Sequence, residues 1–259
     1  MNAVVKSADR TLAILDLLTE HHDGLTLAEI QRTLEFPKSS TYVLLMTMVN
    51  RGFLEQDPDT RRFRVGIRLW QAGQSYVAVS GLERAALPYM EALRDQLNET
   101  VQLATLDGTD NVYIAKVDPD HQLRLASRVG ARLPAYATGI GKAMLAQLED
   151  AEVRGRFGDD TFARYTPQTI GSLDELIEQL RQVRARGYAE DHGEYTPGLY
   201  CVAAAIGTSQ TTPRAAVSVS IPEMRRTPAL VEQAITAVRL TANGIAHRMG
   251  YRTPPTGDH

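Results

Sequence analysis

The chain has 259 residues, of which 43% are hydrophobic and 23% are charged. This composition is ordinary for a folded protein with one large domain or two smaller ones, and it excludes a chain that is disordered throughout. The 28 Lys and Arg residues against 31 Asp and Glu residues give a net charge of −3, so overall charge does not by itself indicate a nucleic-acid binder.

Residues 1–10 lack the apolar stretch of a signal peptide, which predicts a protein that stays in the cytoplasm. The longest apolar run, residues 199–206, is much shorter than the roughly 20 residues of a membrane-spanning helix, so we expect no membrane partner. Cys201 is the single cysteine, which excludes an internal disulfide, and the six histidines show no metal-ligand spacing. We therefore expect no metal and no cofactor.

The first part of the chain carries clear helix signals. Ser7 can cap a first helix whose leucines recur at helical spacing. The run Thr26-Leu-Ala-Glu29 is a capping box, which opens a second helix to about residue 34. Pro37 suits the first turn of a third helix that stops at Gly52.

A hairpin is predicted to follow the third helix. Two β-prone runs, at residues 53–56 and 62–65, flank a strong turn signal. Three helices and a hairpin are typical of a winged helix-turn-helix, here over residues 1–66. Residues 67–81 return to a helical pattern and predict a linker helix.

The third helix has two distinct faces. One face should pack on the first two helices and comprises Thr41, Leu45, Met48 and Val49. The opposite face comprises Ser39, Ser40, Val43, Met46 and Thr47, with Tyr42 at its border. In a helix-turn-helix this outer face enters the major groove, where hydroxyls can bond to phosphates or base edges and an apolar side chain can contact a thymine methyl. A solvated surface helix explains this stretch alone equally well.

Local charge favours the DNA interpretation. Residues 38–68 carry six positive and three negative side chains, and three of the arginines lie in the hairpin, where they suit phosphate contacts. We therefore predict DNA contacts from Lys38, Ser39, Ser40, Tyr42, Val43, Thr47, Arg61, Arg62 and Arg64.

Residues 82–252 alternate helical and β-prone patterns, which predicts an α/β or α+β layer domain. A second capping box, Ser172-Leu-Asp-Glu175, opens a helix that ends at Gly187. The other expected helices are 82–98, 139–148 and 228–249, and the expected strands are 100–106, 111–117, one near 123–128, 188–191, 199–207 and 214–221. Residues 253–259 are predicted to be a disordered tail.

Three features of this second part have chemical potential. The run Thr138-Gly-Ile-Gly-Lys-Ala143 fails as a phosphate loop, but its free amides suit a carboxylate; a tight turn is an equal alternative. Cys201, in an apolar run, is better interpreted as a buried inert thiol than as a nucleophile. Ser218 and Ser220 alternate with valines, so both hydroxyls should point to one face of a strand and need polar partners there.

The chain resembles the IclR family of bacterial transcriptional regulators over nearly its whole length. The amino-terminal segments that carry the resemblance are Ser7-Ala-Asp-Arg-Thr-Leu, Gly24-Leu-Thr-Leu-Ala-Glu-Ile, Pro37-Lys-Ser-Ser-Thr-Tyr and Arg51-Gly-Phe-Leu-Glu-Gln. The later ones are Gly130-Ala-Arg-Leu-Pro-Ala-Tyr-Ala-Thr-Gly-Ile-Gly-Lys-Ala, Arg186-Gly-Tyr-Ala-Glu-Asp, Gly198-Leu-Tyr-Cys-Val-Ala-Ala and Ala215-Ala-Val-Ser-Val-Ser-Ile-Pro. The family commonly has an arginine where Val43 stands, so the operator sequence is expected to differ.

The resemblance implies an α+β protein in which the winged helix-turn-helix is joined to a GAF/PAS-like effector-binding domain. It implies that a small carboxylate is held by the amides of Gly139 and Ile140. It places the pocket aspartate, cysteine and two serines of the family at Asp191, Cys201, Ser218 and Ser220, with Leu133 and Leu199 as apolar wall.

The implied function is that of a repressor or activator of a catabolic or metabolic operon, not of an enzyme. Its partners would be double-stranded operator DNA, a small organic acid or aromatic metabolite, and further copies of the chain as a homodimer or a dimer of dimers. The alternative is a hydrolase or transferase that uses Cys201 or Asp191 with His192, fused to a winged helix that binds protein.

Overall fold

The computed structural model describes residues 5–122, 127–158, 162–207 and 214–251. The chain divides into two compact units, Met1–Val79 and Ser80–His259, and each is described by itself. The predicted tail at residues 253–259 lies outside the described residues, as does most of the strand expected near residues 123–128. No helix of the described part is long and apolar enough to cross a membrane.

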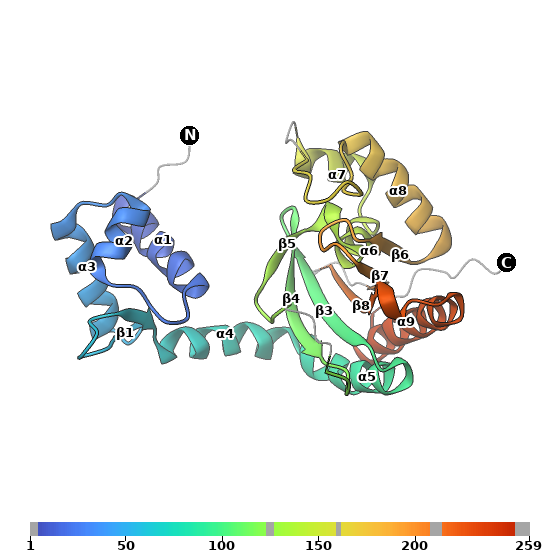
Figure 1. Ribbon diagram of the computed structural model, residues 1–259, viewed down its shortest axis with the longest axis horizontal. Helices are drawn as coiled ribbons and strands as arrows, with labels where there is room; N and C mark the ends of the chain where they lie inside the picture. The colour runs from blue at the N-terminus through green and yellow to red at the C-terminus, as the bar shows by residue number, and fades with distance from the viewer. Residues whose placement is uncertain (1–4, 123–126, 159–161, 208–213, 252–259) are drawn as a thin grey trace. The chain divides into compact units, whose positions relative to one another are not determined.

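The first unit is a winged helix-turn-helix (Figure 1). Its elements are α1 (Lys6–Glu20), α2 (Leu27–Leu34), α3 (Lys38–Asn50), β1 (Leu54–Gln56), β2 (Phe63–Val65) and α4 (Ile67–Ser80). One apolar core joins the three helices to the hairpin, with Ile14, Ile30, Leu45 and Phe63 all at most 1% exposed. The predicted order of elements is therefore confirmed.

The helix starts test the capping predictions. Thr26 and Glu29 form both hydrogen bonds of the predicted capping box. The cap at Ser7 was wrong, because α1 begins one residue before it at Lys6, with Val5 as N-cap and no side-chain cap. Pro37 is the N-cap of α3 and not a first-turn residue, and its carbonyl accepts the amide of Thr41.

The second unit is built on an antiparallel sheet, which makes the fold α+β. Within the described residues the strand order is β5-β4-β3-β8-β7-β6. The bounds are β3 (Thr100–Asp107), β4 (Asp110–Val117), β5 (Arg132–Pro134), β6 (Ala189–His192), β7 (Leu199–Ile206) and β8 (Ala215–Pro222). The short edge strand β5 was not predicted, because three residues are too few to show alternation.

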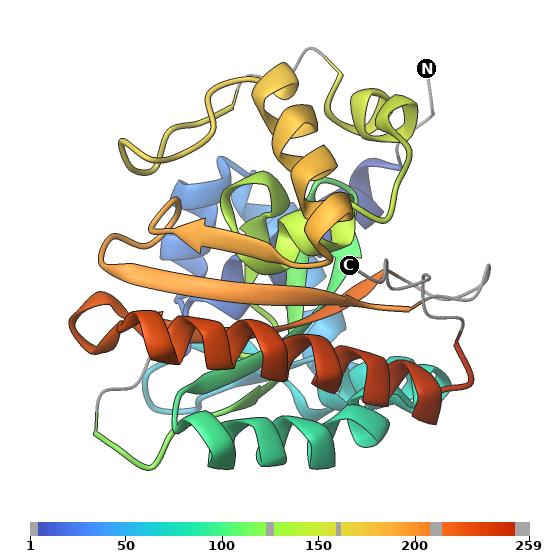
Figure 2. The same cartoon turned by 90° about the vertical axis from the view of Figure 1, so that its right-hand side faces the viewer.

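Helices cover both faces of this sheet (Figures 1 and 2). One face carries α5 (Leu82–Leu97) and α9 (Pro228–Arg248), and the other carries α6 (Gly139–Leu145), α7 (Asp150–Phe157) and α8 (Leu173–Arg186). Two 3-10 turns, Ala135–Ala137 and Glu223–Arg225, precede α6 and α9. The period-2 pattern of β8 is confirmed: Val217 and Val219 enter the core with α5 and α9, so Ser218 and Ser220 face the side of α6.

Two details of the α6–α8 layer differ from expectation. The helix α6 ends at Leu145 and not at 148, and α7 was not predicted at all. At the start of α8 the hydroxyl of Ser172 accepts the amide of Glu175 as expected, but the carboxylate of Glu175 accepts the amide of Gly171 and not that of Ser172. The second capping box is therefore only half formed.

Candidate DNA-binding face and ligand pocket

The outer face of α3 is mixed polar and apolar, as the helical spacing predicted. Thr41, Leu45 and Met48 are buried, whereas Val43 is 63% exposed and Tyr42 is 50% exposed. Met46 was wrongly placed on the outer face: it is half-buried and packs against the core, which a long unbranched side chain can reach. The exposure of the remaining outer residues is compatible with contact to a DNA groove or to solvent.

Two hydroxyls of this face are engaged inside the unit. Ser40 donates to the carbonyl of Pro37 at 3.2 Å and accepts from Arg10 at 3.4 Å. Thr47 donates to the carbonyl of Val43 at 2.7 Å. Lys38 and Ser39 are exposed at the start of the helix, where a phosphate can approach.

The three arginines of the hairpin have different environments. Arg61 is exposed at the tip, in a left-handed conformation with φ 55°. The guanidinium of Arg62 donates to the carbonyl of Gly24 at 2.7 Å and contacts the carboxylate of Glu29 at 3.3 Å. Arg64 donates to Asp57 at 2.9 Å. Among the described residues, Arg61 is thus the hairpin arginine that has no such internal ion pair.

The second unit contains a cavity of about 110 Å³ between the sheet and the start of α6. All eight residues expected from the family resemblance line it: Leu133, Gly139, Ile140, Asp191, Leu199, Cys201, Ser218 and Ser220. Its volume suits a small organic molecule and is well below the usual range for drug-sized ligands.

Six further residues line the cavity: Gln102, Tyr113, Ser127, Thr138, Tyr195 and Thr196. Gln102 lies opposite Ser218 in the sheet, and its side-chain oxygen accepts from the hydroxyl of Ser220 at 3.1 Å. The alternation of polar and apolar residues in β3 could have indicated Gln102, just as it did Ser218. Tyr195 and Thr196 lie in a loop, where no periodic signal exists.

Thr138 and two glycines shape the cavity beside α6. The hydroxyl of Thr138 accepts the amide of Gly141 at 3.1 Å and donates to Asn111 at 2.7 Å. A Cβ at Gly141 would lie 2.3 Å from the backbone of Ala135, so only glycine allows this approach. The amides of Gly139 and Ile140 are in the first turn of α6 and have no acceptor within their own helix, and both residues line the cavity.

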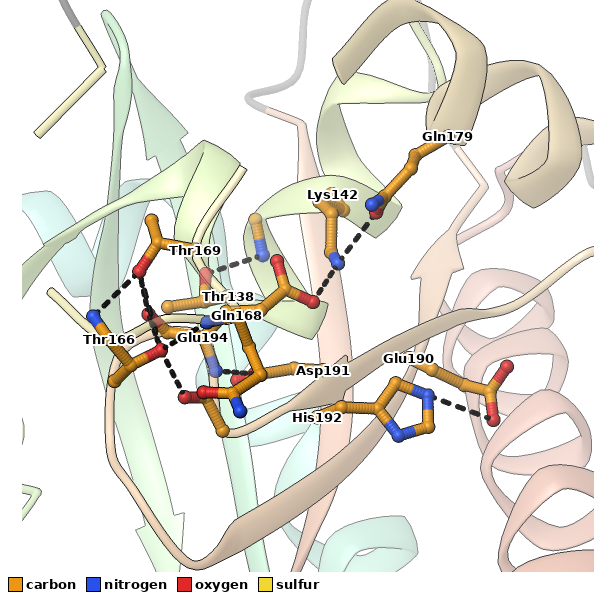
Figure 3. Close-up of polar contacts among 12 residues, drawn as sticks. Thr138, Lys142, Thr166, Gln168, Thr169, Gln179, Glu190, Asp191, His192 and Glu194 are labelled. Atoms are coloured by element: carbon orange, nitrogen blue, oxygen red, sulfur yellow. Dashed lines mark hydrogen bonds and ion pairs between the residues drawn. The ribbon is translucent and has the colours of Figure 1, made fainter. Parts of the chain in front are cut away.

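A buried ion pair lies close to the cavity residue Asp191 (Figure 3). Lys142 donates to Glu194 at 2.5 Å and to Gln179 at 3.0 Å, and Lys142 and Glu194 are 2% and 3% exposed. The amide of Glu194 donates to Asp191 at 2.7 Å. These contacts fix the loop between β6 and β7, which contributes Tyr195 and Thr196 to the cavity.

The same loop is held from its other side by two threonines. Thr166 donates to the carbonyl of Gly193 at 2.8 Å, and Thr169 donates to that of Glu194 at 2.5 Å. Figure 3 shows these bonds on the opposite side of Glu194 from Lys142. These bonds hold the loop backbone in place, while Tyr195 and Thr196 of the same loop line the cavity.

Burial sets the protonation of the cavity groups. It raises the pKa of Asp191 to about 6, with repulsion from Glu194 adding to the shift; the amide of Glu194 and the charge of Lys142 oppose it. Burial also raises the pKa of the Cys201 thiol well above its ordinary value, and the nearby Asp191 adds to this. Cys201 is therefore a neutral thiol, 3.3 Å from the hydroxyl of Ser220.

Comparison with known proteins decides the family. Residues 74–247 match the profile described as bacterial transcriptional regulator IclR C-terminal, and residues 7–58 match the IclR helix-turn-helix domain. The chain belongs to the IclR family of bacterial transcriptional regulators.

Individual members of the IclR family are similar to this chain over most of their length. The regulator BhcR of Paracoccus denitrificans is 34% identical over 94% of this chain and 88% of its own. The transcriptional repressor IclR of Escherichia coli is 34% identical over 86% of this chain and 82% of its own. The crystal structure of a regulator from Rhodococcus is 29% identical, has a TM-score of 0.81, and covers 95% of this chain and 99% of that one.

The family assignment removes the enzyme alternative, because the IclR relatives are transcriptional regulators. The geometry agrees. Asp191 and Cys201 are opposite each other in the sheet, but His192 points to the other face, with its ring 5.1 Å from that of Tyr200 and 3.9 Å from Glu190. The histidine that the enzyme alternative would use as a base therefore does not lie beside the cysteine.

Proposed function

We propose that this IclR regulator binds an operator through α3 and the hairpin, and that a small organic acid or aromatic metabolite in the cavity tunes that binding. The observation that carries the proposal is the small cavity, lined by both apolar and polar side chains, in the unit that follows the winged helix-turn-helix. A regulator with this arrangement controls a catabolic or metabolic operon in response to that metabolite, in the cytoplasm where both are found.

On the DNA side, the exposed residues of α3 and the hairpin tip would make the contacts. Lys38, Ser39 and Arg61, which are exposed, would contact phosphates, and the exposed Tyr42, Val43 and Thr47 would contact base edges. Ser40, Arg62 and Arg64 would contribute partly through the internal bonds that hold α3 and the hairpin in shape.

On the ligand side, the cavity has separate places for different chemical groups. A carboxylate would accept from the amides of Gly139 and Ile140. Asp191 and the hydroxyl of Ser127, which has no hydrogen-bond partner among the described residues, favour a ligand that also carries hydroxyl or similar donor groups. Leu133 and Leu199 would contact its apolar part.

The two sites would be coupled through the chain that joins them. We assign residues 1–66 to DNA binding, 67–81 to the linker helix and 82–252 to effector binding. A ligand changes DNA affinity only if it binds the two conformations of the regulator differently, typically with about 1–3 kcal/mol of coupling. In a homodimer, or a dimer of dimers, two α3 helices would read a palindromic operator.

Exposed apolar residues in the first unit support self-association. Trp70 is 62% exposed, Ile67 is 59% exposed and Val65 is 42% exposed. Apolar side chains gathered in this way along the end of the hairpin and the start of α4 are typical of a protein interface.

The proposal is tested by a thermal-shift screen of small carboxylates and aromatic acids, followed by DNA retention with each hit. A true effector raises Tm and changes the affinity for the promoter of the regulator's own gene. Ser220→Ala should reduce the thermal shift, whereas Met224→Ala, which changes an exposed residue outside the cavity, should not. Failure of every promoter duplex to bind with salt-sensitive affinity would contradict the proposal.

A further inference from the structure

The outer face of α3 has an apolar side chain at its middle that the fold does not use. Val43 is 63% exposed, and it stands one helical turn from both Ser39 and Thr47. Burying an apolar side chain is favourable, and this one gains nothing from the core of its own unit. It is therefore available for an apolar contact with whatever α3 binds.

The neighbours of Val43 lack the groups that read bases through paired hydrogen bonds. Apart from Lys38 at the start of the helix, residues 38–47 contain none of the side chains that bind guanine or adenine in a bidentate way, which are Arg, Lys, Asn and Gln. The hydroxyl hydrogen of Thr47 is donated to the carbonyl of Val43, and that of Ser40 to the carbonyl of Pro37. The hydroxyl of Thr47 is thereby left as an acceptor on the outer face, whereas that of Ser40 also accepts from Arg10.

The major groove offers one apolar feature, the 5-methyl group of thymine. We propose that Val43 is the specificity-determining residue of α3 and that it contacts a thymine methyl in each operator half-site. The contact selects thymine by burying two apolar groups against each other, and not by a hydrogen bond. This inference rests on the proposed DNA-binding function and adds the base that the helix selects.

The expected effect follows from the size of the buried group. Removing one methyl-sized group from an apolar contact weakens binding by about fourfold. Because a dimer would make the contact twice, loss of the methyl from both half-sites should weaken binding by about 16-fold, since independent effects multiply.

The experiment replaces thymine by uracil, which removes the methyl and keeps the base pair. Operators are first selected by the full-length protein from random duplexes, and each thymine of the half-site is then changed to uracil in turn. Fluorescence anisotropy measures Kd. We expect one position at which uracil weakens binding by about fourfold per half-site, and we expect Val43→Ala to lose this difference while still binding DNA.

Two further variants make the test specific. Thr47→Ser removes the other methyl on the same face and should keep the uracil effect, while Val43→Arg should shift the preferred base at that position from thymine to guanine. A uracil effect that is absent, that persists in Val43→Ala, or that disappears in Thr47→Ser overturns the inference. Selection of no duplex at all would overturn the proposed function as well, whereas salt-sensitive binding without a methyl effect overturns only this inference.

Discussion

At the scale of single residues, Asp191 has the most unusual environment in the cavity. It is 4% exposed, and burial raises its pKa to about 6 from an ordinary value of 3.8. The amide of Glu194 and the ammonium group of Lys142 only partly offset the loss of water. An aspartate in this state is ionised at neutral pH at a cost to the fold, and it can accept a hydrogen bond from a ligand.

The raised pKa predicts how stability depends on pH. Since the folded protein binds this proton more readily than the unfolded chain, the contribution of Asp191 to stability increases as pH falls through 6 towards 4, by roughly 2–3 kcal/mol. Asp191→Asn keeps the acceptor for the amide of Glu194 and removes the titration.

Urea denaturation of both proteins at about pH 7.5 and about pH 4.5 tests this. The unfolding free energy of wild type relative to that of Asp191→Asn should be larger at the lower pH. Titrating groups that do not interact with Asp191 cancel in that difference. A difference that is the same at both pH values would show that Asp191 titrates normally.

At the scale of elements, the hairpin contains one arginine that is exposed at its tip and two whose guanidinium groups make contacts within the first unit. Arg61 is exposed at the tip, while Arg62 connects β2 to Gly24 and to the capping box of α2. The three hairpin arginines could not be distinguished from the sequence alone, because nothing in their spacing shows which guanidinium has an acceptor within the unit.

This difference predicts unequal salt dependence. Arg61→Ala should reduce the slope of log K against log salt by about one unit for each phosphate that is no longer neutralised, or about two for a dimer on its operator. Arg62→Ala should lower Tm, because a carbonyl and a carboxylate lose their donor, and should change the slope less. Equal slopes for wild type and Arg61→Ala would remove the hairpin tip from the DNA interface.

The helix α6 is joined to the loop between β6 and β7 by the buried pair Lys142–Glu194. Removing one partner of a buried pair leaves an uncompensated charge, which costs about 3–5 kcal/mol. We expect Lys142→Met to destabilise the protein by this amount and the double variant Lys142→Met with Glu194→Gln to recover part of it. Chemical denaturation of the three proteins measures the coupling, and strictly additive effects would contradict it.

Much of the fold could be predicted because its elements carry local signals. The capping box at Thr26 and the alternation of Ser218 and Ser220 with valines specify a helix start and a strand face directly. The helix α7 and the strand β5 could not be predicted, because both are short and are defined by tertiary contacts. For the cavity, periodicity indicated the two serines, whereas Asp191, Leu133 and Leu199 came from the resemblance alone, and Tyr195 lies in a loop with no signal.

At the scale of the whole molecule, ligand and operator act on one equilibrium. If a metabolite weakens operator binding by some factor, the operator must weaken binding of that metabolite by the same factor. We expect a factor of about 5 to 150, which corresponds to the usual coupling free energy.

Calorimetric titration of the ligand into free protein and into the protein–operator complex measures this factor, and the DNA titration with and without ligand measures it again. The two values should agree. An effector whose affinity is the same with and without operator, yet which changes DNA retention, would have to act by a route other than binding in the cavity.

The close approach of Gly141 to Ala135 limits which positions of such a sensor can be substituted to change its ligand preference. Position 141 has no room for a side chain, since an added Cβ would lie 2.3 Å from the backbone of Ala135. Leu133, Tyr195 and Leu199, by contrast, line the cavity from the strand β5, a loop and the first residue of β7, where different side chains can be accommodated. New ligand preferences, whether reached by natural drift or by a biosensor library, should therefore accumulate at this rim while the turn at Gly141 stays the same.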